Sequence, residues 1–257
     1  MFAAVLGLSI LPICAVTALA QGEATSPIQL VFATELAPLS FEKAGEAKGI
    51  LIDIAREVFA VRLEQPVVTT LYPWERAQQM VRSGEADGFI TVATTERDSY
   101  ANCGRIPVLR ADLHPIIRPD SPQRTDIEAA RNLADLRQFD IVSYFGNGWA
   151  KQNLAGHKVF YAQDFQSSLY GLAQGRGDLA LGTTTSGAHY MREPDLAGKL
   201  VMLPLVVDTF EYVLCFSKNS PHAAKLSEFE RVLEVMRMDG GYAPILQGYG
   251  MAADAVY

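Results

Sequence analysis

Basic residues, histidine and cysteine are all scarce in this sequence of 257 residues. Its 22 Lys and Arg residues are outnumbered by 29 Asp and Glu residues, which gives a formal net charge of −7. An acidic chain does not attract phosphate backbones, so we expect no nucleic-acid partner. The four histidines are far apart, and no His-x-x-x-His or Cys-x-x-Cys spacing occurs. The sequence therefore predicts no metal site and no cofactor.

The first twenty residues are uncharged and mostly apolar, and they end in small residues at positions 18 and 20. This pattern predicts a signal peptide that spans residues 1–20 and is cleaved before Gln21. A short membrane anchor is the alternative, although Pro12 interrupts the stretch. The first basic residue is Lys43, so the positively charged start typical of a signal is missing, which leaves the translation start open. No later run resembles a membrane span, so we expect an exported, soluble, periplasmic protein.

Only two of the three cysteines remain once the predicted signal has been removed. Cys14 leaves with the signal, and Cys103 and Cys215 stay in the chain. In an oxidising compartment an even pair favours a disulfide, but two separate buried thiols fit the sequence equally well. The sequence alone does not decide the pairing.

Strand and helix patterns alternate twice along the chain, which is typical of an α/β fold with parallel strands. The first unit has expected strands at 28–33, 67–71 and 87–92, a loop that extends to Lys48, and expected helices at 49–63 and 74–83. The second unit has expected strands at 114–118, 141–144, 159–162 and 178–182, and expected helices at 127–136, from 149 onward, and at 167–175. A strand at 210–217 and a helix at 223–238 follow. No low-complexity linker separates the units, so we expect strands to run between them.

A series of short motifs recurs in the order and spacing of one protein family. They are Ala37-Pro-Leu-Ser-Phe41, Gly49-Ile-Leu-Ile-Asp53, Ser83-Gly-Glu-Ala-Asp87, Thr94-Thr-Glu-Arg97, Phe145-Gly-Asn-Gly148, Gly175-Arg-Gly-Asp178 and Asp239-Gly-Gly-Tyr242. From about residue 28 to residue 249 the chain resembles the family 3 extracellular solute-binding proteins, which serve ABC importers of polar amino acids and related solutes.

The resemblance implies a two-lobed type II periplasmic-binding-protein fold, in which each lobe is a mostly parallel sheet flanked by helices. Lobe 1 would hold residues 21–109 and 212–257, and lobe 2 would hold residues 110–211. Two hinge strands would join the lobes, and the ligand would lie between them. The resemblance also implies a monomer that delivers a small carboxylate-bearing molecule to an ABC transporter permease in the inner membrane.

Arg97 is the main candidate for the ligand's carboxylate. It resembles the family's carboxylate-binding arginine, and the planar guanidinium matches a carboxylate and stays charged. On residue type alone, a surface arginine at the start of a helix that Thr94 caps is the favoured interpretation, and the family position reverses that preference. Gly146-Asn147-Gly148 precedes an expected helix, where free backbone N–H groups favour an anion. A plain tight turn is the alternative there, and the resemblance places this segment opposite Arg97.

Other candidate contacts follow from the resemblance. Trp74 would form an aromatic wall, although a single Trp is often a core residue. Thr91 and Thr94 would add hydroxyl donors, and Tyr144 a polar contact. Leu36 and Phe41 would form another wall.

One position departs from the family pattern. Members that bind α-amino acids usually carry an aspartate where this chain has Thr183, and a buried ammonium without a counter-charge is costly. Either Glu35 or Glu75 replaces that aspartate, or the ligand has no amino group. We expect an organic acid or modified amino acid rather than an ordinary amino acid.

Two alternatives to a transport protein share the same expected pocket. The first is a periplasmic dehydratase of prephenate-like acids, for which Glu35, Glu75 or His189 would have to supply an acid or base. The second is a ligand sensor with no role in transport. Each of the three side chains also reads as a solvated polar residue, and no Gly-x-Ser-x-Gly elbow occurs, so we expect a binding protein rather than an enzyme.

Overall fold

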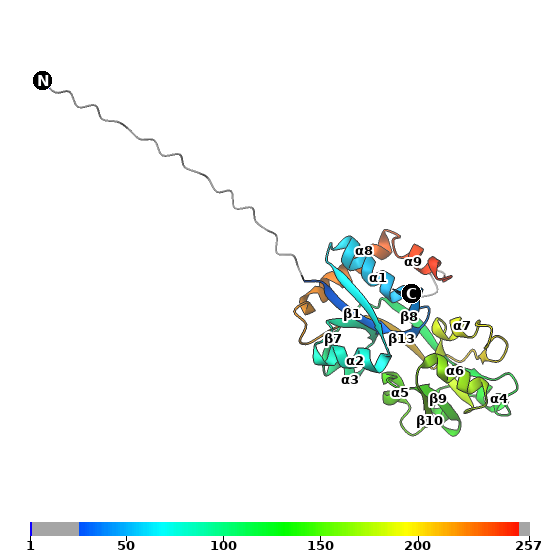
Figure 1. Cartoon of the computed structure of the whole chain (residues 1–257). Coiled ribbons are helices and arrows are strands. Elements are labelled where there is room, and N and C mark those ends of the chain that lie inside the picture. The colour runs from blue at the N-terminus through cyan, green and yellow to red at the C-terminus, as the bar shows by residue number, and fades with distance from the viewer. Residues whose placement is uncertain (2–25, 252–257) are drawn as a thin grey trace.

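The computed structural model describes Met1 and residues 26–251. The predicted signal peptide and Cys14 lie outside the described residues. The described chain forms two lobes at opposite ends of the molecule (Figure 1). Both lobes are α/β, as the sequence predicts.

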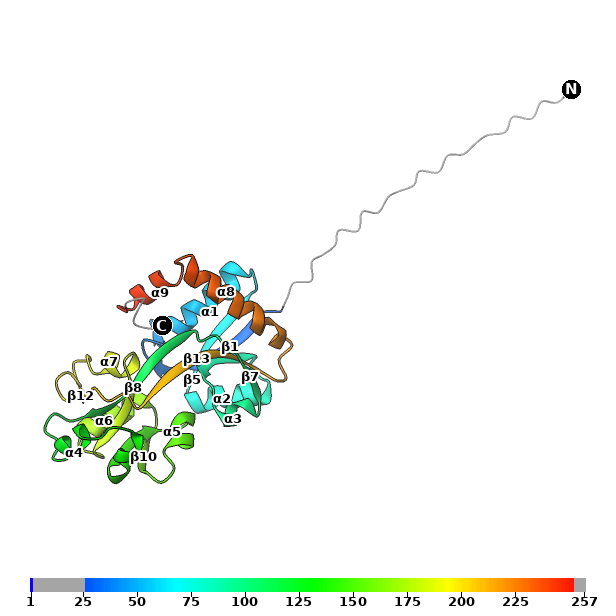
Figure 2. The same ribbon diagram turned by 180° about the vertical axis from the view of Figure 1, so that it is seen from behind.

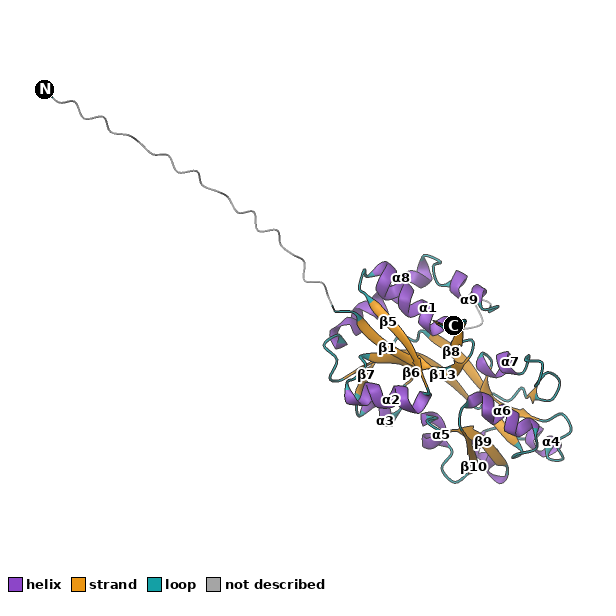
Figure 3. Cartoon of the chain, viewed as in Figure 1, coloured by secondary structure: helices purple, strands orange, loops and turns teal. Residues whose placement is uncertain are grey.

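One long sheet runs through both lobes in the order β10-β9-β11-β8-β13-β6-β1-β5, with β12 paired to β8 and β7 paired to β13. Helices lie on both of its faces (Figure 3). Its strands are β1 (Ile28–Ala33), β5 (Val67–Tyr72), β6 (Gly88–Val92), β7 (Ala101–Cys103), β8 (Leu109–Ile117), β9 (Asp140–Tyr144), β10 (Lys158–Ala162), β11 (Leu179–Thr183), β12 (Val201–Met202) and β13 (Asp208–Ser217).

The pairing within each lobe is largely parallel. β1 pairs with β5 and β6, and β9 pairs with β10 and β11, all in parallel. The two long strands β8 and β13 pair antiparallel with each other and pass from one lobe to the other (Figure 2). They are the two hinge strands that the family resemblance implies.

Helices of the first lobe follow the predicted apolar spacing. α1 (Ile50–Arg56) continues as a π-helical turn, η1 (Glu57–Arg62), and buries Ile50, Ile54 and Val58 completely. α2 (Trp74–Ser83) starts directly after Pro73 and ends at Gly84, whose φ of 81° suits a residue without a Cβ. The remaining elements are α3 (Thr95–Asp98), η3 (Ala223–Lys225), α8 (Leu226–Met238) and α9 (Ala243–Gly248).

In the second lobe one predicted helix is wrong. The segment 127–136 forms the end of α4 (Arg124–Glu128) and part of a 3₁₀ helix, η2 (Leu133–Gln138). Asn132 separates them because its extended backbone and its side chain, which accepts a hydrogen bond from the Asp135 N–H, start a new turn. The other helices are α5 (Gly148–Asn153), α6 (Phe165–Ala173) and α7 (Ser186–Tyr190).

The expected loop that extends to Lys48 is instead a small antiparallel sheet of β2 (Glu35–Leu36), β3 (Ser40–Lys43) and β4 (Glu46–Lys48). Ala44 and Gly45, with φ of 53° and 79°, form its tight turn. Short strands at this position give too little alternation of polar and apolar residues to be recognised in the sequence.

Separate apolar cores stabilise the two lobes. The largest fills the first lobe around Phe59, Phe216 and Phe229, and the second lobe has its own cores around Ile141 and Leu169. Cys103 and Cys215 form a disulfide that joins β7 to β13 in the first lobe. No helix within the described residues is long and apolar enough to cross a membrane.

Candidate functional site

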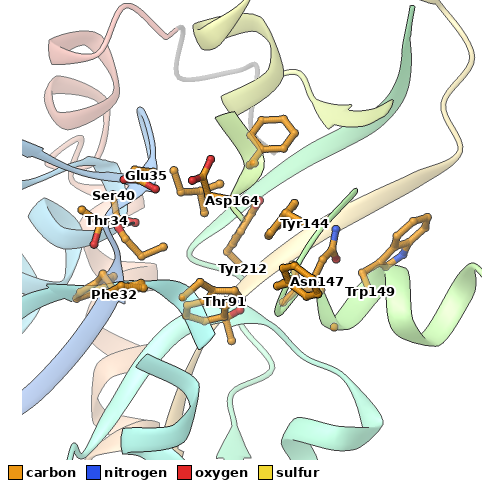
Figure 4. Close-up of a pocket in the computed structure, with 18 of the residues that line it drawn as sticks. Phe32, Thr34, Glu35, Ser40, Thr91, Tyr144, Asn147, Trp149, Asp164 and Tyr212 are labelled. Carbon is orange, nitrogen blue, oxygen red and sulfur yellow. Dashed lines mark hydrogen bonds between the residues drawn. The ribbon is translucent and has the colours of Figure 1, made fainter. Parts of the chain in front are cut away.

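A cavity of about 360 Å³ lies between the lobes, at the level of the hinge strands (Figure 4). Strand ends and loops of both lobes form its walls. The residues that line it are Phe32, Ala33, Thr34, Glu35, Leu36, Ser40, Leu51, Pro73, Trp74, Ile90, Thr91, Val92, Arg97, Tyr144, Phe145, Asn147, Gly148, Trp149, Gln163, Asp164, Phe165, Phe210 and Tyr212.

Arg97 lines this cavity and is held in one orientation by the first lobe. It lies on the short helix α3, whose N-cap residue Thr94 accepts a hydrogen bond from the Arg97 backbone N–H. The guanidinium donates from Nη1 to the Val92 carbonyl at 2.7 Å and from Nη2 to Gln78 Oε1 at 3.0 Å. Its carbon Cζ lies 5.3 Å from the centre of the Trp74 ring, a cation–π arrangement.

The charge of Arg97 has no counter-ion of its own. Arg97 is only 3 % exposed, and among the described residues no carboxylate forms an ion pair with it. Burial lowers the pKa of Arg97, which is the direction expected when a cation loses its hydration. Its Nε atom is buried without a hydrogen-bond partner in this part of the chain. A buried cation of this kind is stabilised by an anion in the cavity.

The Gly146-Asn147-Gly148 turn of the second lobe packs directly against this arginine. A Cβ atom at Gly148 would lie 3.1 to 3.2 Å from the guanidinium atoms, so the absence of a side chain allows the close approach. The side chain of Asn147 caps α5 by accepting a hydrogen bond from the Ala150 N–H. α5 spans only six residues, so the segment acts mainly through its turn geometry.

Several bonds connect the lobes around the cavity, and together they describe a closed arrangement. The Gly146 carbonyl accepts hydrogen bonds from Trp74 Nε1 at 3.0 Å and from Gln78 Nε2 at 3.1 Å. Lys151 on α5 pairs with Glu96 on α3 at 2.8 Å. On the other flank, the Ala37 N–H donates to the hydroxyl of Tyr190.

Two carboxyl groups lie together at another part of the cavity wall. Glu35 in the first lobe is exposed and lies close to Asp164 in the second lobe. Loss of hydration and the hydrogen-bonding and charge effects of Asp164 raise the pKa of Glu35. Asp164 also caps α6 by accepting a hydrogen bond from the Ser167 N–H at 2.6 Å. The lobes therefore meet here through a pair of acids that can share a proton.

The structure brings together most of the residues singled out in the sequence. Trp74, Thr91, Arg97, Tyr144 and Asn147 line the main cavity, as do Glu35, Leu36 and Gly148. Gly146 and Glu75 line a neighbouring hollow of about 220 Å³ between α2 and α5. Ligand roles for all of these residues remain predictions.

Thr94, Phe41, Thr183 and His189 also lie outside the main cavity wall. Thr94 serves as the cap of α3, and Phe41 packs edge-on against Tyr249. Thr183 Oγ1 forms hydrogen bonds with Thr185 Oγ1 at 2.8 Å and with the Ser186 N–H at 3.1 Å, and it borders only a small adjoining hollow. A ligand contact from Thr183 remains a prediction.

Sequence reasoning missed a group of cavity residues on β13 and near α5 and α6. Phe210 and Tyr212 lie on the hinge strand β13. In the sequence this strand looks like an ordinary core strand, and its residues 212–217 are indeed all buried. Asp164, Phe165 and Trp149 lie at or next to the starts of α6 and α5. The only signal was position, since residues just after the carboxyl ends of parallel strands face the crevice of an α/β sheet.

Comparisons with known proteins agree with this architecture. The model of the bacterial extracellular solute-binding proteins, family 3, matches residues 28–252. No curated protein matches the sequence.

Solved structures with the same fold include proteins of different function. A histidine kinase sensor domain similar to periplasmic binding proteins superposes with a TM-score of 0.76 at 21% identity, covering 88% of this chain and 96% of that one. The arginine-, lysine-, histidine-binding protein of Geobacillus stearothermophilus gives a TM-score of 0.73 at 19% identity, covering 88% and 96%. An ancestral amino acid-binding protein, a precursor of cyclohexadienyl dehydratase, gives 0.70 at 19%, covering 87% and 95%. At these identities the likeness shows the fold alone.

Proposed function

Because the chain belongs to the family 3 bacterial extracellular solute-binding proteins, we propose that it binds one small carboxylate-bearing solute between its lobes. It then delivers that solute in the periplasm to the permease of an ABC importer. The observation that supports this proposal is Arg97, a buried guanidinium on the wall of the interlobe cavity for which no described residue supplies an ion-pair partner. The ligand's carboxylate supplies the missing negative charge.

Binding and lobe closure are coupled in this proposal. Arg97 belongs to the first lobe and the Gly146–Gly148 turn to the second, so a carboxylate between them contacts both. Such a ligand stabilises the closed arrangement only to the extent that it binds that arrangement more tightly than an open one. The bonds of Trp74 and Gln78 to the Gly146 carbonyl form in the same closed arrangement.

The first test is a ligand screen by thermal unfolding, followed by calorimetry of each hit. The panel holds amino acids, 2-oxo acids, dicarboxylates and aromatic acids, and a ligand at 100 times its Kd adds about 2.7 kcal/mol to stability. Arg97→Ala should weaken the binding of a carboxylate hit by about 2–4 kcal/mol, roughly 30- to 1000-fold. Arg131→Ala is the charge-matched control because its side chain is 88% exposed. Equal binding by the Arg97→Ala variant would contradict the proposal.

If the protein were an enzyme rather than a binding protein, the acids at the cavity wall would be its candidate catalytic groups. Glu35 is the acid with a raised pKa that lines the cavity, and a dehydratase needs a proton donor at that kind of position. We propose that the pair makes closure depend on pH and performs no chemistry. Incubation of each ligand with the protein, followed by mass spectrometry, tests this, since formation of a dehydrated product would overturn it.

Transport and sensing differ in the partner that recognises the closed protein. Stimulation of a reconstituted ABC importer's ATPase by the ligand-bound protein supports transport. Ligand-dependent binding to a kinase without such stimulation supports a sensor.

A further inference from the structure

Two tyrosines of the main cavity, Tyr144 and Tyr212, have hydroxyls that the described residues leave available for a ligand. Tyr144 ends β9 in the second lobe, and Tyr212 lies on the hinge strand β13 with 6 % of its surface exposed. Among the described residues neither hydroxyl has a hydrogen-bond partner. The chain's other interlobe tyrosine, Tyr190, does have one, the Ala37 N–H. Both side chains line the cavity, so an occupant of the cavity can bond to their hydroxyls.

Both hydroxyls stay protonated at neutral pH, and both tyrosines line the same cavity as Arg97. Burial raises the pKa of Tyr144 to about 12 and also raises the pKa of Tyr212. The positive charge of Arg97 acts on both groups in the opposite direction, so both lie within its electrostatic reach. At neutral pH each hydroxyl can donate one hydrogen bond and accept another. Arg97 therefore shares the cavity wall with two neutral hydrogen-bonding groups.

This surrounding suits an oxygen next to the carboxylate better than an ammonium. The substituent on the α-carbon lies one bond from the carboxylate carbon, so the groups near Arg97 also surround that substituent. A hydroxyl or carbonyl oxygen accepts hydrogen bonds from the tyrosines, whereas an ammonium can only donate and needs a counter-charge when it is buried. Thr183, the residue that departs from the family's aspartate, is neutral and already bonded to Thr185 and Ser186.

The remainder of the cavity is built for a ring and for one negative charge. Eight of the lining residues are aromatic: Phe32, Trp74, Tyr144, Phe145, Trp149, Phe165, Phe210 and Tyr212. They include two neighbouring ring pairs, Tyr144 with Phe165 at 5.8 Å and Phe210 with Tyr212 at 6.2 Å between centroids. Arg97 is the one cation among the described lining residues. The other two charged residues of the wall, Glu35 and Asp164, are acids. A second carboxylate on the ligand would have no cation to meet.

We propose that the ligand is a ring-bearing monocarboxylate with an oxygen on its α-carbon, that is, a 2-hydroxy or 2-oxo acid, and that the hydroxyls of Tyr144 and Tyr212 select that oxygen. This inference rests on the proposed binding of a carboxylate by Arg97. It adds the two tyrosines as specificity-determining residues, one from each side of the cleft. Polar groups placed to bond a ligand oxygen discriminate strongly against an analogue that lacks it.

The test is calorimetry with five matched acids on the full chain. 3-Phenyllactate and phenylpyruvate carry the α-oxygen, 3-phenylpropanoate carries hydrogen there, L-phenylalanine carries an ammonium, and lactate lacks the ring. We expect the better of the two α-oxygen acids to bind at least about 10-fold more tightly than each of the other three. Tighter binding of L-phenylalanine, or equal binding of lactate, would overturn the proposal.

Tyr144→Phe and Tyr212→Phe test whether the two hydroxyls cause the preference for an acid with an α-oxygen. Each substitution keeps the ring and removes only the oxygen, and unfolding temperatures confirm that both variants fold. We expect each to reduce the preference for 3-phenyllactate over 3-phenylpropanoate about 3- to 10-fold while leaving 3-phenylpropanoate binding unchanged. A preference that survives both substitutions would refute the role of the tyrosines.

Arg97→Ala distinguishes failure of this inference from failure of the proposed function. If lactate or other acids bind, lose binding in Arg97→Ala and show no preference for ring or α-oxygen, the inference is wrong and the proposed function stands. If no carboxylate binds the unmodified chain, both are wrong.

Discussion

The Arg97 end of the cavity and the Glu35 end differ in how firmly the protein holds the charge. Arg97 is buried, bonded through both terminal nitrogens and covered by the Trp74 ring. Glu35 is exposed and interacts with Asp164 of the other lobe. A group whose position is fixed in advance loses little entropy on binding. In the proposed function the first end recognises the ligand, and the second responds to the approach of the lobes.

Among the changes that leave the arginine in place, Gly148→Ala should reduce ligand binding at the Arg97 end most. The new Cβ would lie 3.1 Å from Nη2, so the guanidinium or the turn must shift. Overpacking of this kind costs about 1–3 kcal/mol, and we expect ligand affinity measured by calorimetry to fall roughly 10-fold or more. Gly248→Ala is the control because nothing lies within 4 Å of its new Cβ. Equal affinity in the two variants would show that the close approach is unimportant.

Trp74→Phe should have a smaller effect, because it preserves an aromatic wall and removes one bond between the lobes. The indole N–H donates to the Gly146 carbonyl at 3.0 Å, and Gln78 still donates to the same oxygen. Loss of one such bond costs about 0.5–1.5 kcal/mol, so we expect a 3- to 10-fold loss of affinity. Small-angle X-ray scattering without ligand should show a larger radius of gyration. An unchanged radius would argue that this bond does not hold the lobes together.

The Glu35 end should make closure depend weakly on pH. Because the pKa of Glu35 is raised in the closed protein, that state binds the proton more tightly than an open or unfolded one. Stability from this group is present at low pH and is lost as the pH rises through the raised pKa, above the ordinary value of 4.5. Glu35→Gln should flatten this dependence and change affinity at neutral pH by only about 2-fold. Unfolding temperatures from pH 4 to pH 8 test this.

The control for the pH series is Glu234→Gln, which removes an exposed carboxyl on α8 far from the cavity. If both variants give the same pH profile, the pair of Glu35 and Asp164 does not couple closure to protonation.

Strand and helix patterns in the sequence correctly predicted the alternation of elements, and the family motifs correctly predicted the two lobes. Periodicity located α2 at its observed bounds because Pro73 and Gly84 mark both ends. It failed at residues 127–136, where one side-chain bond from Asn132 interrupts an otherwise suitable pattern. The small sheet β2–β4 was missed because its strands are two to four residues long.

Some residues of the candidate site could also be predicted from the sequence, and others could not. Arg97 and the Gly146–Gly148 turn belong to short motifs that can be recognised along the chain. Tyr212 and Phe210 carry no such motif, and they reach the cavity only because β13 pairs with β8 in a specific register. Long-range pairing of this kind has no local signature.

The disulfide between Cys103 and Cys215 fixes one end of the strand on which the lobes turn. β13 is tied to β7 at Cys215, and three residues earlier, at Tyr212, the same strand borders the cavity. The disulfide therefore holds the Cys215 end of β13 within the first lobe. A ligand that touches Phe210 and Tyr212 acts at the pivot itself, where a small shift in backbone angle becomes a large displacement at the distant rims of the lobes.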